Sequence, residues 1–184
     1  VLFQEAQQIN PENDAVYYEL ALHEFQAKDV PSAKANIDKA IELDDKNHWY
    51  YLLLANVEIE QGNLPEAEKA FAKTCKLNPD DIQTFFELAT VMVYQEKYDD
   101  AIEVYDQLEQ RLGVSEDLSF QKQQLYLQQG KVDEALSELE KLITENPNDI
   151  RYLAMLAQFY TETADTEKAL ATFERMRAID PNSG

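Results

Sequence analysis

The residue types that most often carry catalysis or bind metals are scarce in this sequence and are not clustered. Its two histidines, His23 and His48, lie far apart in the chain and match no metal-binding spacing such as His-Glu-x-x-His. Cys75 is the only cysteine, so neither an intramolecular disulfide nor a cysteine-based zinc site can form. We interpret Cys75 as a packing residue, because free cysteine is commonly buried. The sequence therefore predicts no metal site.

Carboxylates are abundant, but their positions indicate a structural role. The pairs Asp80-Asp81 and Asp99-Asp100 lie near expected helix starts, where negative charge interacts favourably with the helix dipole. The 4 glycines in the chain form no glycine-rich phosphate loop, and no Asp-x-Asp-x-Asp-Gly calcium loop occurs. We therefore expect a protein that is not an enzyme and that binds no cofactor.

The charge balance narrows the range of partners. Lys and Arg number 16 against 36 Asp and Glu, for a formal net charge of −20. Such a surface repels phosphate, which argues against nucleic acid and anionic membranes as partners. Two interpretations stay open: a solvated acidic surface that maintains solubility, or a surface that attracts a basic partner. No apolar run approaches the roughly 20 residues that cross a bilayer, so we expect no membrane insertion.

A repeat in the sequence indicates the secondary-structure elements that position these residues. Alanine recurs every 34 residues at five positions: Ala33, Ala67, Ala101, Ala135 and Ala169. A bulky apolar residue follows each alanine four positions later: Ile37, Phe71, Tyr105, Leu139 and Phe173. Upstream, apolar and small residues recur with i, i+3 and i+4 spacing, which is typical of an amphipathic helix. Each unit therefore predicts two helices joined by a short turn, as at Gln61-Gly62-Asn63.

Together these features resemble the tetratricopeptide repeat family. The unit at 48–81 carries Tyr51, Leu54-Ala55, Gly62 and Ala67, followed by Phe71 and Pro79. The resemblance implies an all-α fold, a right-handed superhelical solenoid of antiparallel helix-turn-helix repeats. It covers 1–184 as a single domain, expected to be a fragment of a longer protein. The divisions are a half repeat at 1–13 and repeats at 14–47, 48–81, 82–115, 116–149 and 150–183.

The fourth repeat departs from the pattern. Ser119, Lys122 and Gln123 stand where the other repeats carry a bulky residue, leucine and alanine. Leu118 and Phe120 provide apolar residues at neighbouring positions. These substitutions predict a helix that is rotated or slipped by one residue.

The resemblance also implies a binding surface, because the first helix of each repeat lines the concave face where partners of this family usually bind. The groove residues mapped in this way are Tyr18, Leu22, Trp49, Leu52, Asn56, Phe86, Thr90 and Tyr94. Contiguous exposed apolar side chains usually mark an interaction site. The alternative is that some of them pack between adjacent repeats. Only Asn56 matches the Lys, Asn and Arg positions with which some family members grip a peptide carboxylate, which argues against that mode.

The sequence thus predicts a non-catalytic scaffold that binds a peptide or helix of a protein partner, basic or apolar in character. Two alternatives stay open. One is a structural segment that self-associates through uncapped ends, where Leu2, Phe3 and Ile9 lie. The other is the recognition arm of a larger enzyme or complex. The single cysteine fits a reducing compartment and favours the cytoplasm, whereas a periplasmic or secreted location is open if an upstream signal was removed.

Overall fold

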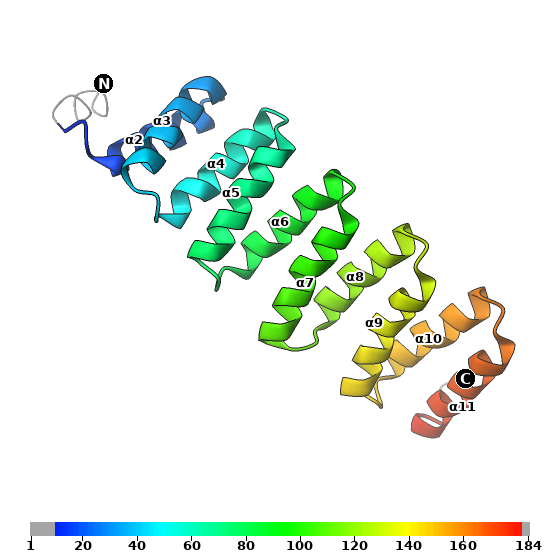
Figure 1. Ribbon diagram of the computed structural model, residues 1–184. Helices are drawn as coiled ribbons and strands as arrows, with labels where there is room; N and C mark the ends of the chain where they lie inside the picture. The colour runs from blue at the N-terminus through cyan, green and yellow to red at the C-terminus, as the bar shows by residue number, and fades with distance from the viewer. Residues whose placement is uncertain (1–9, 182–184) are drawn as a thin grey trace. The chain divides into compact units, whose positions relative to one another are not determined.

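The computed structural model describes residues 10–181, and within that range it contains ten α-helices and no strand (Figure 1). The first helices of the repeats are α2 (Asp14–Gln26), α4 (His48–Glu60), α6 (Ile82–Tyr94), α8 (Glu116–Gln128) and α10 (Ile150–Glu162). The second helices are α3 (Val30–Leu43), α5 (Leu64–Leu77), α7 (Tyr98–Leu112), α9 (Val132–Glu145) and α11 (Thr166–Ile179). Each first helix begins 34 residues after the previous one, so the predicted all-α repeat fold is confirmed.

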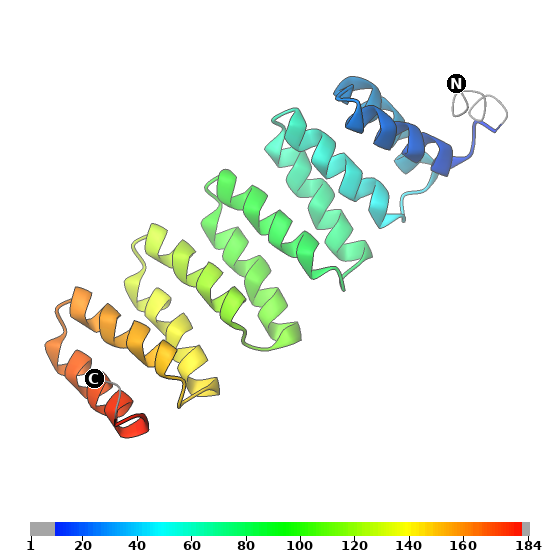
Figure 2. The same cartoon turned by 180° about the vertical axis from the view of Figure 1, so that it is seen from behind.

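Contacts divide the chain into two compact units, Val1–Val104 and Tyr105–Gly184, with the boundary inside α7. In the first unit α2 packs against α3 and α4 against α5, while α3 and α5 also contact the first helix that follows them. In the second unit α8 pairs with α9 and α10 with α11. Figure 2 shows the same helices from the opposite side, with α2 alongside α3, α4 alongside α5, α8 alongside α9 and α10 alongside α11.

The alanine column explains how closely the paired helices approach. Ala33, Ala67, Ala101 and Ala135 have no exposed surface, and Ala169 is 5% exposed. Helix axes can come close together only where a small side chain leaves room. The bulky residue four positions later then packs into the interior, as Ile37 and Phe71 do.

The turns inside the hairpins share one backbone conformation. A single residue in each turn has positive φ: Lys28 (62°), Gly62 (77°), Glu96 (60°), Gly130 (70°) and Ala164 (60°). This left-handed residue lets the chain reverse after the first helix, and glycine adopts it without the steric cost that other residues incur. Three of the five turns therefore use a residue that is strained at this position.

Repeat four keeps the register of the other repeats, so the predicted slip of its helix is wrong. Ser115 accepts a hydrogen bond from the Leu118 amide and caps α8 at the expected residue. Ser119 and Lys122 occupy the inward positions of the pattern and are only 1% and 0% exposed. The helix tolerates a lysine there because carboxylates from neighbouring helices surround its ammonium group.

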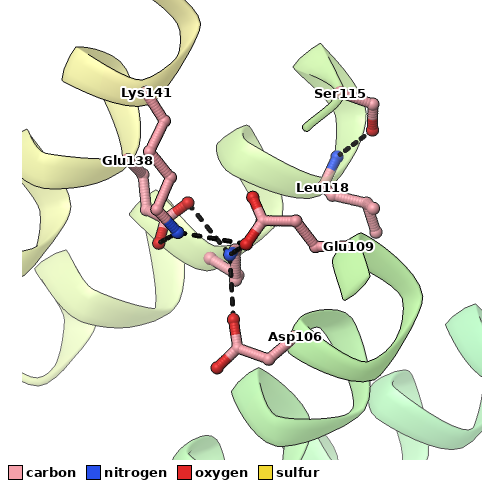
Figure 3. A network of polar contacts seen from close by, with 7 residues as sticks. Asp106, Glu109, Ser115, Leu118, Glu138 and Lys141 are labelled. Atoms are coloured by element: carbon pink, nitrogen blue, oxygen red, sulfur yellow. Dashed lines mark hydrogen bonds and ion pairs between the residues drawn. The ribbon is translucent and has the colours of Figure 1, made fainter. Parts of the chain in front are cut away.

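Figure 3 shows this ion network around the buried ammonium group. Lys122 Nζ lies 2.9 Å from Asp106 Oδ1, 2.7 Å from Glu109 Oε2 and 3.0 Å from Glu138 Oε2. Lys141 Nζ bridges Glu109 and Glu138 at 3.1 and 2.9 Å. Burial lowers the pKa of Lys122, but its hydrogen bonds to Glu109, Asp106 and Glu138 raise it more, so the pKa stays above its usual value. Lys122 is therefore a buried cation that remains charged.

Candidate functional site: a cavity between α4 and α6

A cavity of about 270 Å³ opens between the first helices of repeats two and three. Its lining comes from three helices of the first unit: Asn56 and Ile59 of α4, Leu64 and Phe71 of α5, and Glu87, Thr90, Val91 and Tyr94 of α6. Asn56 and Ile59 are three positions apart on α4, and on α6 Thr90 and Val91 each lie three or four positions from both Glu87 and Tyr94. That spacing places them on one face of each helix, so two helical faces form the walls and α5 closes the base.

The cavity is apolar at its base and partly exposed at its rim. Phe71 and Val91 are buried, with 1% and 3% exposed surface. Ile59 is 40% exposed and Tyr94 is 74% exposed. An isolated exposed apolar side chain is ordinary, but these two flank a buried apolar floor. The arrangement leaves room for a side chain from another molecule.

The polar atoms of the lining are mainly hydrogen-bond acceptors. Asn56 Nδ2 donates to the Leu52 carbonyl at 2.8 Å, and Thr90 Oγ1 donates to the Phe86 carbonyl at 2.7 Å. A carbonyl only accepts, so the first contact fixes the amide orientation of Asn56 and directs its Oδ1 away from that bond. The Glu87 carboxylate receives one long contact, 3.5 Å from Gln83 Nε2. A ligand in this cavity would therefore meet oxygen acceptors.

The helices around the cavity share its negative character. The first helices of the first unit, α2, α4 and α6, contain no lysine or arginine. Their six acidic residues are Asp14, Glu19, Glu24, Glu58, Glu60 and Glu87. Two of these form ion pairs with lysines from a turn or a second helix, since Lys28 Nζ lies 2.9 Å from Glu60 Oε1 and Lys34 Nζ lies 3.5 Å from Glu58 Oε1. Among residues 10–181, no lysine or arginine forms an ion pair with Glu87.

Three of the eight groove residues predicted from the sequence line this cavity: Asn56, Thr90 and Tyr94. Two others are half-buried and pack against the interior. Tyr18 and Leu22 pack against a buried cluster that includes Tyr50, and the Tyr18 and Tyr50 rings lie 5.1 Å apart. Packing between adjacent repeats therefore accounts for much of the surface of these two side chains.

The remaining predicted residues lie outside the cavity lining. Trp49 is 53% exposed and stacks on the His48 ring, with 4.7 Å between ring centroids. Leu52 and Phe86 are half-buried. These residues occupy the first turns of α4 and α6 or the positions just after them, so they extend the surface toward the helix starts. Their role in binding stays a prediction.

Five cavity residues were not among the eight groove residues predicted from the sequence. Ile59 lies three positions after Asn56 on the helix face that was mapped to the groove, and Val91 and Glu87 could have been found from their helical spacing to Tyr94 and Thr90. Leu64 and Phe71 belong to the second helix of repeat two. Phe71 also belongs to the repeat's apolar column, so its pattern indicates only the core. That pattern does not indicate that one side of the Phe71 ring faces a cavity.

Metal-ligand clusters and the single thiol are the other features of the chain that could carry chemistry. Among residues 10–181, no group of three or more His, Cys, Asp or Glu side chains could hold a metal ion. Cys75 is buried, and burial raises the pKa of its thiol to about 12, so the thiol stays protonated near neutral pH. No helix within that range is both long and apolar enough to span a membrane.

Comparisons with known proteins agree with this architecture. The tetratricopeptide repeat family matches residues 24–91, 92–158 and 126–184, whereas no curated protein matches the chain. One similar structure is YrrB, "a TPR protein with an unusual peptide-binding site", with 24% identity, a TM-score of 0.62 and coverage of 98% of this chain and 93% of that one.

Two further structures show the same fold at lower identity. A MamA protein shares 18% identity with a TM-score of 0.62, covering 93% of each chain. PilF of Pseudomonas aeruginosa shares 16% identity with a TM-score of 0.59, covering 98% of this chain and 82% of that one. The helical hairpins, their 34-residue spacing and a family match that extends from residue 24 to residue 184 establish that this chain belongs to the tetratricopeptide repeat family.

Proposed function

We propose that the chain is a protein-interaction scaffold whose first unit binds an extended or helical segment of a partner along α4 and α6. The observation that carries this proposal is the cavity between those helices, with a buried apolar floor and the exposed side chains of Ile59 and Tyr94 at its rim. Apolar anchors in such pockets contribute most of the energy of many interfaces. The tetratricopeptide fold supports the same role, and YrrB, which has this fold, is named for a peptide-binding site.

The proposal is tested by selecting binders from a random peptide library on the purified chain and measuring the affinity of the selected peptides. Truncation of the exposed ring in Tyr94→Ala removes the rim of the cavity, and we expect it to weaken binding by about 1–2 kcal/mol. Trp49→Ala and Phe86→Ala test the extension of the surface toward the helix starts. Leu170→Ala is the control, because Leu170 is 59% exposed on α11, outside this surface. Equal affinity in Tyr94→Ala, Trp49→Ala and Phe86→Ala would contradict the proposal.

A second candidate, self-association through an exposed helix face, is favoured by one observation. Phe173 on α11 is 49% exposed, although the equivalent residues of the other repeats are almost completely buried: Ile37 at 0%, Phe71 at 1%, Tyr105 at 3% and Leu139 at 2%. Solenoid repeats bury this face against the next repeat. The residues first suspected of self-association, Leu2, Phe3 and Ile9, lie outside the described residues. A role as the recognition arm of a larger enzyme or complex stays a prediction from the sequence.

A further inference from the structure

We propose that the cavity between α4 and α6 receives an arginine side chain of the bound segment, with the guanidinium group held by the Glu87 carboxylate. This inference rests on the proposed function, because it names the residue class that the peptide site recognises. It depends on the combination of an apolar base and an acceptor-rich rim within a single cavity.

The apolar part of the cavity suits the stem of a long cationic side chain. Ile59, Val91 and Phe71 form a surface on which three methylene groups can lie. Arginine and lysine bury such stems along apolar surfaces while their charged ends reach toward polar groups or water. A short polar side chain would leave this floor uncovered, so the base of the cavity favours a long one.

The rim then selects a donor-rich cation. Glu87, Asn56 Oδ1 and the hydroxyl oxygen of Thr90 are all acceptors, and among residues 10–181 Glu87 has no cationic partner. An apolar side chain would displace water from these acceptors without donating hydrogen bonds to them, and the unsatisfied acceptors would cost free energy. A carboxylate would be repelled by Glu87. A cation satisfies both the charge and the acceptors.

Two features favour arginine over lysine. The guanidinium group carries five N–H donors in a planar fork and can meet several acceptors at once, whereas the ammonium group is a compact point charge. Tyr94, which is 74% exposed at the rim, offers an aromatic face on which a guanidinium plane can stack. The absence of lysine and arginine from α2, α4 and α6 favours both cations equally, because either would enter without a competing cation on these helices.

The experiment begins with a random peptide library selected on the wild-type chain. We expect the selected peptides to share an arginine at one fixed position. One such peptide is then synthesised together with versions in which that arginine is replaced by citrulline, which has the same shape without the charge, or by lysine. Titration calorimetry on the wild-type chain should show that the citrulline peptide binds about 10-fold or more weakly, since hydrogen bonds between charged groups are worth more than neutral ones.

Variants of the chain assign this effect to Glu87. In Glu87→Gln we expect the arginine peptide to lose about 10-fold in affinity and the citrulline peptide to change little. Glu103→Gln on α7 is the matched control, because it removes the same charge from an exposed residue outside the cavity. Library selection on Glu87→Arg should yield peptides in which an acidic residue replaces the arginine.

The outcomes separate this inference from the proposed function. Peptides that depend on Tyr94 but carry no shared arginine would overturn the inference and leave the groove function standing. Equal affinities of the arginine and citrulline peptides, or an unchanged affinity in Glu87→Gln, would do the same. Equally tight binding of the lysine peptide would overturn the assignment to arginine. If the wild-type chain selects no peptide at all, both proposals fail.

Discussion

At the residue scale, Lys122 is the least expected feature of the molecule. Its side chain has no exposed surface, yet it is held by Asp106 and Glu109 of α7 and by Glu138 of α9. A buried ion pair is tolerated only when the two groups are well aligned and their remaining donors and acceptors have hydrogen-bond partners. The network therefore replaces the apolar contact that leucine makes in the other repeats.

Truncation in Lys122→Ala should destabilise the chain by about 3–5 kcal/mol, because it leaves buried carboxylates without their central cation. Urea unfolding followed by circular dichroism measures the change. Lys69→Ala is the control, since Lys69 is 71% exposed and pairs with Glu66 on the same helix, and exposed pairs contribute about 0–1 kcal/mol. Similar losses in the two variants would show that the buried network contributes no more than a surface pair.

At the element scale, the helices could be predicted from the sequence, but the register of α8 could not. The repeating alanines and bulky residues set each helix face through local spacing alone. Lys122 is a polar residue at a position that is leucine in the other repeats, so the pattern suggests a rotated helix. The carboxylates that make its burial tolerable lie 13 and 16 residues away on α7 and α9. The pattern of residues within one helix cannot show that carboxylates of neighbouring helices neutralise a buried lysine.

The same limit applies to the candidate site. The family resemblance predicts Asn56, Thr90 and Tyr94 on the inner face because each belongs to a first helix at a definite repeat position, and all three line the cavity. The base of the cavity is formed by α5, which the groove prediction did not consider. Tyr18 is half-buried and its ring lies against that of Tyr50 in the next repeat, so its exposure could not be judged from its own helix.

The turns between paired helices provide a test at this scale. In Ala164→Gly we expect stabilisation of up to about 1 kcal/mol, because glycine adopts the left-handed conformation without the steric cost that alanine incurs at φ 60°. Thermal unfolding measures the shift. The matched control is Ala171→Gly, an exposed position inside α11, which should destabilise by about 1 kcal/mol. A loss of stability in Ala164→Gly would contradict the proposed strain.

At the scale of the whole molecule, charge determines how partners approach. A formal net charge of −20 creates a field that attracts basic segments and repels phosphate-rich surfaces, with most influence on association rate and specificity. The acidic composition alone could not distinguish a solvated surface from a recognition surface. Glu87 lies beside an apolar cavity and forms no ion pair with a lysine or arginine among residues 10–181, which favours recognition at this one site.

The exposed face of α11 provides a test of the self-association candidate. If Phe173 mediates self-association, the wild-type chain should form larger species as concentration rises, and Phe173→Ser should remain monomeric, because the apolar contact is lost. Sedimentation velocity over a wide concentration range makes the comparison. Leu127→Ser, which changes a residue with 48% exposure on α8, is the control. A wild-type chain that is monomeric throughout would rule out association through this face.

The ion network around Lys122 also limits how interchangeable the repeats are. Solenoid repeats are often treated as modules that can be deleted, duplicated or transplanted at hairpin boundaries. Here a cut between α7 and α8 would separate the lysine from Asp106 and Glu109, and a fourth repeat placed elsewhere would carry a buried cation without these partners. Any transferable piece of this region must therefore keep α7 together with α8 and α9, and chimaeras that separate these helices should fold poorly even when every hairpin is intact.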